Sequence, residues 1–206
     1  MKDVDEFEKR VNKVVVGLQR GLFDNASSAR ARVARLRAAE GSMFGEVPEI
    51  WDLEGECLPD RILEIDDMRA GGDVMAFQNA AHVALCGYAV SQQLSNGQAA
   101  VRRRRLEGTF GRAVHAAAMA QRADGAMPDS FRLTIASQDF DELSRHLLHT
   151  LRFVGSHGKS LDFGHLAGQV ARWHRRSERV GVVREWGHEW ASYRVSKSGK
   201  EDAGQE

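Results

Sequence analysis

The sequence contains no run of apolar residues close to the roughly 18 that a membrane-spanning helix requires, so no membrane partner is expected. Its first ten residues, MKDVDEFEKR, are charged, which predicts that they are not a secretory signal. Only two cysteines occur, Cys57 and Cys86, and they sit among apolar neighbours without forming a CxxC pair. The sequence therefore predicts reduced core cysteines in a cytoplasmic protein.

Common catalytic and nucleotide-binding motifs are also missing: no GxSxG occurs, and Walker and dinucleotide glycine patterns are absent. His146 and His149 have a spacing that zinc could use, but no second close pair and no cysteine accompanies them, so we favour polar surface histidines. Glu64, Asp66 and Asp67 could hold Mg²⁺ in a nuclease, but their segment contains no histidine or lysine that could act with the metal, so we favour a role without metal. The sequence predicts a protein without catalytic activity, cofactor or metal, and a metal-dependent nuclease is the enzymatic alternative.

No segment alternates apolar and polar residues for long enough to predict a strand, and apolar residues instead recur at helical spacing. Asp139 and Glu142 have the spacing of a capping box, and Ser160 or Asp162 can cap the helix that follows. These signals predict an all-α protein with about eight helices in two packed bundles. The clearest helices are expected over residues 4–21, 27–37, 74–93, 109–121, 139–155, 160–173 and 180–195, with one or two short helices between 41 and 72 and another after Pro128.

A break in charge and regularity around an arginine run at 102–105 suggests two structural units. We predict an N-terminal helical bundle over residues 1–107 and a C-terminal helical bundle over residues 108–195. Residues 196–206 are polar and contain glycine, which predicts a disordered tail.

Three of the four tryptophans are expected in the helical core and one on the surface. Trp173, Trp186 and Trp190 stand at helical spacing with other apolar residues, so packing in the core is favoured over stacking on nucleic-acid bases. Trp51 lies in an irregular acidic segment and is expected to be exposed and to touch a partner.

The formal charge is zero, but the charged residues are segregated along the chain. Residues 40–67 contain ten acidic residues and one basic residue, whereas residues 20–37 contain five arginines and one aspartate. Residues 71–194 contain sixteen basic and eleven acidic residues. A polyanion would therefore meet the basic side, and the acidic segment could face another protein or repel misplaced nucleic acid.

Four consecutive arginines, Arg102 to Arg105, form a concentrated positive charge. Guanidinium groups stay charged and need their own partners, so the run must lie on the surface or in a groove filled by something acidic. A predicted helix begins soon after it, and the free N–H groups at a helix start favour phosphate. We hypothesise that this segment holds a nucleic-acid backbone. A solvated loop whose arginines pair with the chain's own acidic residues is the alternative.

Further arginines project from the predicted C-terminal helices. Arg145 and Arg152 are seven residues apart, so they share one face of a helix. Together with Arg112 and the run at 102–105, they could line a groove that follows a single strand and reads its backbone charge. A solvated charged face is the alternative.

Several segments, in this order and spacing, resemble a known family. They are ARLR at 34–37 followed by PEIW at 48–51, the helix at 74–93, GTFGRA at 108–113, and residues 131–173 with the pieces DSFRLTIAS, ELSRHLLHTLRF and LDFGHLAGQVARW. Together they cover most of residues 20–195 and resemble CasB, the small subunit of the type I-E CRISPR surveillance complex Cascade. The acidic segment at 40–67 departs most from the family pattern.

The resemblance implies an all-α subunit of two bundles, without catalytic activity. Family members sit as a head-to-tail pair beside the large and backbone subunits of Cascade and leave sequence reading to base pairing. They contact the backbone of guide RNA (crRNA) and target DNA, and they steady the displaced non-target strand of the R-loop. By position, the resemblance implies backbone contacts from Arg35, Arg37, Arg112, Arg132, Arg145 and Arg152, and in a basic loop of varied sequence from Arg102, Arg103, Arg104 and Arg105. A scaffold that binds only protein is the non-enzymatic alternative.

Overall fold

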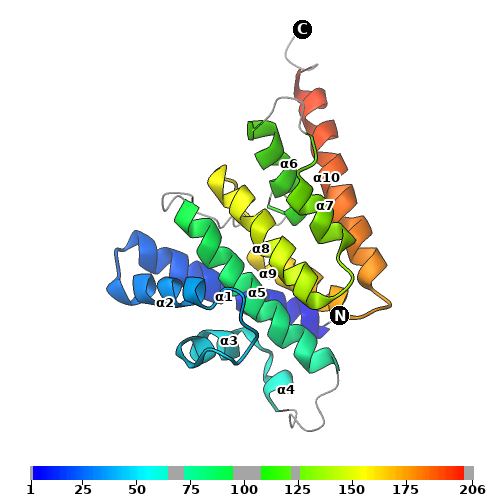
Figure 1. The fold of residues 1–206 in the computed structure, drawn as a ribbon. Coiled ribbons are helices and arrows are strands. Elements are labelled where there is room, and N and C mark those ends of the chain that lie inside the picture. The colour runs from blue at the N-terminus through cyan, green and yellow to red at the C-terminus, as the bar shows by residue number, and fades with distance from the viewer. Residues whose placement is uncertain (1, 65–71, 95–107, 122–125, 202–206) are drawn as a thin grey trace.

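The computed structural model describes residues 2–64, 72–94, 108–121 and 126–201, and within these ranges it contains helices and no β-strand (Figure 1). The predicted all-α fold class is confirmed. The elements are α1 (Lys2–Phe23), α2 (Ser27–Ala38), the 3₁₀-helix η1 (Pro48–Ile50), α3 (Trp51–Cys57), α4 (Asp60–Leu63), α5 (Gly72–Leu94), α6 (Phe110–Gln121), α7 (Asp129–Ala136), α8 (Phe140–Ser156), α9 (Phe163–His174) and α10 (Arg179–Glu201).

The described ranges hold ten α-helices, where the sequence predicted about eight. Segment by segment, they correspond to the seven clearest predicted helices, two short helices between 41 and 72 and one after Pro128. Both predicted caps are present. Asp139 Oδ1 accepts a hydrogen bond from the N–H of Glu142 at 2.9 Å, and Asp162 Oδ1 accepts one from the N–H of His165 at 2.8 Å. These caps fix where α8 and α9 begin.

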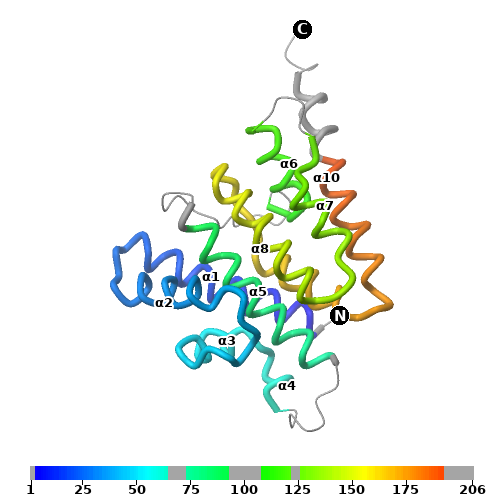
Figure 2. The backbone as a smooth tube through the Cα atoms, in the orientation of Figure 1, coloured from blue at the N-terminus to red at the C-terminus, as the bar shows by residue number. Residues whose placement is uncertain are grey.

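The long helix α5 lies at the centre of the molecule. It packs against α8 and α9 and also contacts α1, α2 and α3, while α10 packs against α6 and α9. Figure 2 shows α2, α3 and α4 on one side of this centre and α6, α7 and α10 on the other. Buried residues of both predicted bundles, such as Phe7, Tyr88, Phe163 and Trp186, belong to one core cluster. The division into bundles at 107/108 stays a prediction.

The tryptophans lie where their spacing predicted. Trp173 and Trp186 are fully buried, and Trp190 is half-buried and stacks on Phe131 with ring centroids 5.4 Å apart. These three rings therefore belong to the core and its edge, whereas Trp51 is 54% exposed.

Cys57 and Cys86 are free and buried, as expected. α10 continues to Glu201 and so enters the segment at 196–206 that was predicted to be a tail, and the residues after it lie outside the described ranges. None of the described helices is both long enough and apolar enough to span a bilayer.

Candidate nucleic-acid interface

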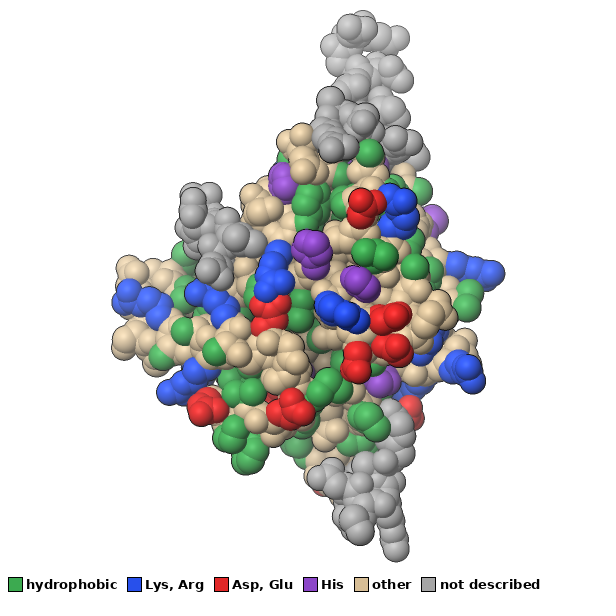
Figure 3. Space-filling view, viewed as in Figure 1, with side chains coloured by type: hydrophobic (Ala, Val, Ile, Leu, Met, Phe, Trp, Pro, Cys, Tyr) green, Lys and Arg blue, Asp and Glu red, His purple; other side chains and the backbone are tan. Residues whose placement is uncertain are grey.

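A groove along α8 contains two of the predicted arginines. It has a volume of about 780 Å³ and is lined by Arg145, Arg152, His146 and His149, together with α7 and the loop at residues 40–43. The 3.6-residue period of α8 separates this polar face from the buried stripe, so the arginines and histidines point away from the core. Figure 3 shows arginine and histidine side chains together over α8. The buried stripe comprises Leu143, Leu147, Leu151 and Val154.

The positive charge of the groove is partly neutralised. Arg152 pairs with Glu40 across the groove, and Asp141 also lines it. Arg145 is exposed and makes no ion pair or hydrogen bond with the part of the chain that the structure describes. Arg145 is therefore the arginine of this groove that is available to an external anion.

The two predicted arginines of α2 also differ in whether they have a partner within the chain. Arg35 is exposed and has no partner among the described residues. Arg37 instead donates from Nε to the carbonyl oxygen of Ala89 on α5 at 3.1 Å, which ties α2 to the central helix. The arginines at 102–105 lie outside the described ranges.

Two further predicted arginines have contacts within the chain. Arg112 on α6 donates from Nε to Oγ of Ser192 on α10 at 3.2 Å, and Arg132 pairs with Asp129 at the start of α7. Of the predicted residues that the structure describes, it brings Arg145 and Arg152 into one groove. The backbone-binding role of the whole set stays a prediction.

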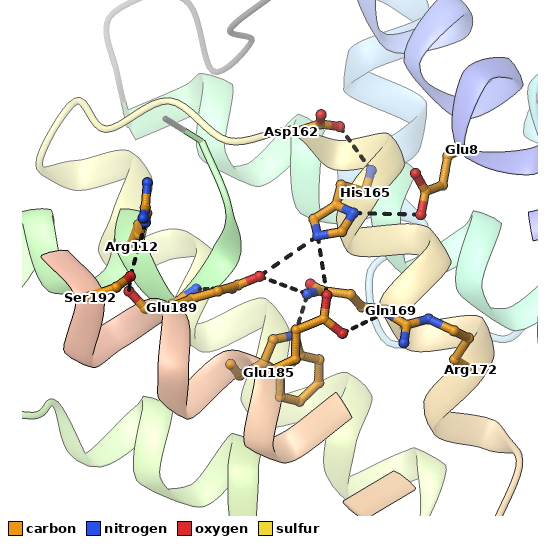
Figure 4. Close-up of polar contacts among 11 residues, drawn as sticks. Glu8, Arg112, Asp162, His165, Gln169, Arg172, Glu185, Glu189 and Ser192 are labelled. Atoms are coloured by element: carbon orange, nitrogen blue, oxygen red, sulfur yellow. Dashed lines mark hydrogen bonds and ion pairs between the residues drawn. The ribbon is translucent and has the colours of Figure 1, made fainter. Parts of the chain in front are cut away.

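The most concentrated polar network lies elsewhere, where α1, α9 and α10 meet (Figure 4). His165 on α9 has three carboxylates around its ring: Nδ1 lies 3.5 Å from Glu8, and Nε2 lies 3.6 Å from Glu185 and 3.7 Å from Glu189. Burial lowers the pKa of His165, but the carboxylates of Glu189 and Glu8 outweigh this effect and raise the pKa to about 9. His165 is therefore protonated at neutral pH and bridges three helices.

Hydrogen bonds hold the carboxylates of this network in place. Glu189 accepts from the N–H of Gly111 on α6 and from Nε2 of Gln169, both at 2.9 Å. Glu185 accepts from Nη2 of Arg172 at 2.6 Å. Gln169 in turn accepts from the indole N–H of the buried Trp186 at 2.8 Å. Because every partner lies on a different turn or helix, the network fixes α6, α9 and α10 against one another.

A metal site is the chemical alternative for this network. His165, Glu185 and Glu189 offer ligand atoms within 4.8 Å of one another, which makes them the group in the described ranges whose geometry could hold an ion. A protonated imidazole has no free lone pair for a metal, and the two carboxylates already accept hydrogen bonds from the protein. The arrangement fits a buried ion network better than a metal centre.

A second buried pair joins the acidic segment to the centre of the fold. Glu54 on α3 lies 2.6 Å from Nδ1 of His82 on α5, and both side chains are almost fully buried. The other oxygen of Glu54 accepts from the N–H of Gly45 at 3.2 Å. In the sequence, Glu54 belongs to the acidic segment at 40–67, and its pairing could not be predicted because His82 lies 28 residues away in the chain.

Comparisons with known proteins agree with this fold. Residues 32–190 match the family model of the CRISPR-associated protein Cse2. The chain is similar to the crystal structure of CasB from Thermobifida fusca, with a TM-score of 0.71 and 23% identity over 90% of this chain and 97% of that chain. It is also similar to the crystal structure of M. ruber CasB, with a TM-score of 0.60 and 18% identity over 95% of this chain and 98% of that chain. No curated protein sequence matches it. Because the family model matches well over half of the chain, this protein belongs to the Cse2 (CasB) family of CRISPR-associated proteins.

Proposed function

We propose that this chain is a non-catalytic subunit of a type I-E Cascade that holds nucleic-acid backbones and stabilises the R-loop in antiviral defence. Membership of the Cse2 family implies a place in the Cascade complex. The observation that carries the finer proposal is the groove along α8, where the exposed Arg145 lies beside His146, His149 and Arg152. The described residues that line this groove include no Phe, Tyr or Trp ring that could stack on a base, which favours contact with phosphate.

The mechanism is electrostatic and independent of base sequence. Each arginine that neutralises a phosphate releases condensed counterions, so binding becomes sensitive to salt. Exchange of a DNA duplex for an RNA–DNA duplex is nearly balanced in free energy, so a few backbone contacts are enough to favour the R-loop. The proposed ligands are crRNA, the target strand and the displaced non-target strand. The proposed protein neighbours are the large and backbone subunits and a second copy of this chain, in the cytoplasm.

Reversing the charge of the arginine run is expected to weaken the R-loop. In a complex that carries Arg102, Arg103, Arg104 and Arg105 all changed to Glu, the dissociation of the R-loop should become faster. The dependence of log K on log salt should fall by roughly 0.7 per lost contact, and so by about 3 for four contacts. The measurement is R-loop lifetime across a salt series. An unchanged lifetime and salt dependence would remove this segment from the proposal.

Two substitutions in the α8 groove are expected to act in opposite directions. Arg145→Gln should weaken binding of single-stranded nucleic acid by the complex about fivefold, because it removes a charged contact. Glu40→Gln should strengthen binding about threefold, because it releases Arg152 from its ion pair. Gel-shift titrations measure both effects. Arg184→Gln is the matched control, since Arg184 is an exposed arginine on α10 that does not line the groove.

The same titrations separate the alternatives. Binding that is absent at low salt would favour a scaffold that contacts only protein, a function consistent with the internal partners of Arg37, Arg132 and Arg152. Metal-dependent nicking that is lost when Glu64, Asp66 and Asp67 become alanine would favour the nuclease. Glu64 is exposed at the end of α4, and Asp66 and Asp67 lie outside the described ranges.

A further inference from the structure

A second exposed surface lies at α3 and α4, next to the loop whose residues 40–43 line the α8 groove. It contains a pocket of about 410 Å³ lined by apolar side chains that include Phe44, Trp51, Leu58 and Leu63. Trp51 and Leu63 are each 54% exposed although both are large and apolar. Met75, on the first turns of α5, is 53% exposed and lies one helical turn before Gln78, which lines the pocket. Exposed apolar residues that gather around a pocket mark an interaction site more often than a solvated surface.

The pocket is built on a rigid frame. The indole N–H of Trp51 donates to the carbonyl oxygen of Gly45 at 2.8 Å, which holds the ring at the rim of the pocket. Glu54 lines the pocket and is anchored below it by His82. Because Trp51 and Glu54 are already fixed, their side chains lose little conformational entropy when a partner binds. Tryptophan is also among the residues that most often contribute a large share of the binding energy at protein interfaces.

The charge around this pocket selects the partner. Glu49, Glu56 and Glu64 are exposed, lie within two residues of residues that line the pocket, and have no ion pair among the described residues. The described arginines that contact this region are already paired: Arg61 with Asp3, Arg10 with Asp60 and Arg32 with Asp52. Figure 3 shows acidic and hydrophobic side chains side by side over α3. Unpaired carboxylates repel a nucleic-acid backbone and attract a cationic partner.

We propose that the α3–α4 pocket docks a lysine- or arginine-rich segment of another protein subunit, which inserts an apolar side chain beside Trp51 and Leu63. The carboxylates of Glu49, Glu56 and Glu64 face the basic residues of that segment. This inference rests on membership of a multi-subunit complex and does not depend on nucleic-acid binding by the α8 groove. In this proposal, the α3–α4 pocket contacts protein and the α8 groove contacts nucleic acid.

Site-specific cross-linking in the assembled complex tests this proposal. The photoreactive amino acid p-benzoylphenylalanine replaces Trp51 in the tagged chain, the complex is purified and irradiated, and cross-linked peptides are identified by mass spectrometry. The matched control carries the same amino acid in place of Val180, an exposed apolar residue on α10 that is 59% exposed. We expect at least fivefold more cross-linked product from position 51 than from position 180, joined to a segment of another subunit that has an excess of lysine and arginine.

A charge variant tests the second half of the proposal. Changing Glu49, Glu56 and Glu64 to glutamine should lower the yield from position 51 at least fivefold, while the unfolding midpoint of the chain stays the same. Three results would each overturn the proposal: equal yields from positions 51 and 180, a cross-link to nucleic acid or to a second copy of this chain, or a yield that the glutamine substitutions leave unchanged. Because the gel-shift titrations of the Arg145 and Glu40 variants report on the α8 groove, failure of one proposal is distinguishable from failure of the other.

Discussion

Replacing Gly164 with alanine is expected to lower the free energy of unfolding by about 3 kcal/mol. A Cβ at this position would lie less than 3.0 Å from the main-chain oxygen of Glu8 on α1 and 2.6 Å from Cγ of Asn12. Main-chain atoms cannot rotate away as a side chain can, so α9 and α1 would have to separate. The separation would also stretch the hydrogen bond from the Gly164 N–H to Oδ1 of Asn12, now 3.0 Å.

Gly17→Ala is the matched control for this expectation. Gly17 lies in α1, the helix that Gly164 contacts, but a Cβ at Gly17 would meet nothing within 4 Å. Alanine is the better helix former, so this variant should be more stable by about 0.5–1 kcal/mol. Urea unfolding followed by circular dichroism measures both changes. Equal losses of stability in the two variants would show that a general intolerance of substitution, rather than close approach of α1 and α9, controls the result.

Close contacts at glycine let α9 approach α1 and let α6 approach α10. Gly164 and Gly168 are four residues apart on α9, and both face Glu8 of α1. Gly111 on α6 similarly faces the backbone of α10, where a Cβ would lie 2.7 Å from the N of Trp190. The pairs of glycines at helical spacing were visible in the sequence. Apolar periodicity locates the helices, but it does not indicate which of them touch through their backbones.

The helices could be predicted because their signals are local. Apolar spacing and the caps at Asp139 and Asp162 depend on residues within one or two turns, and the structure has both features. The burial of Trp173 and Trp186 followed from the same periodicity. Helix number was less accurate, because α4 spans only Asp60–Leu63 and leaves no periodic pattern.

The polar interior could not be predicted because its partners are distant in the chain. Glu54 was counted with the acidic segment at 40–67, yet it faces the buried His82, and Glu8 at the start of the chain faces His165. The same limit applies to the candidate site. The sequence identifies Arg152 as an arginine on the polar face of a helix, but its neutralisation by Glu40 depends on how α8 packs beside the loop after α2.

The stability of the chain is expected to fall by about 2 kcal/mol as the pH rises from about 6.5 to about 8.5, owing to His165 alone. The pKa of His165 is raised to about 9 in the folded protein, above its ordinary value of 6.5. The folded state therefore holds this proton more tightly than the unfolded state. The resulting stabilisation is fully present below the unfolded pKa and is lost as the pH rises through the folded pKa. Urea unfolding at a series of pH values measures the decline.

His165→Gln isolates this effect, because the charged groups that face the ring remain: Glu8 on α1, Glu185 and Glu189 on α10, and Arg172 on α9. The variant should be less stable than the parent at pH 6.5, and its stability should change little up to about pH 8.5. Above that pH both proteins should lose stability, since burial raises the pKa of Cys57 and Cys86 and their thiols ionise only on unfolding.

His174 affects the stability of the chain below pH 6.5, outside the range in which His165 dominates. Burial, together with the nearby charge of Arg179, lowers the pKa of His174, so its contribution removes stability as the pH falls below about 6.5. The decline between pH 6.5 and 8.5 therefore belongs to the His165 network. If the parent and the His165→Gln variant declined in parallel across this range, the imidazole would be neutral in the folded state. His165 would then not balance the charge of the carboxylates around it, and a metal ion at Glu185 and Glu189 would again be an alternative.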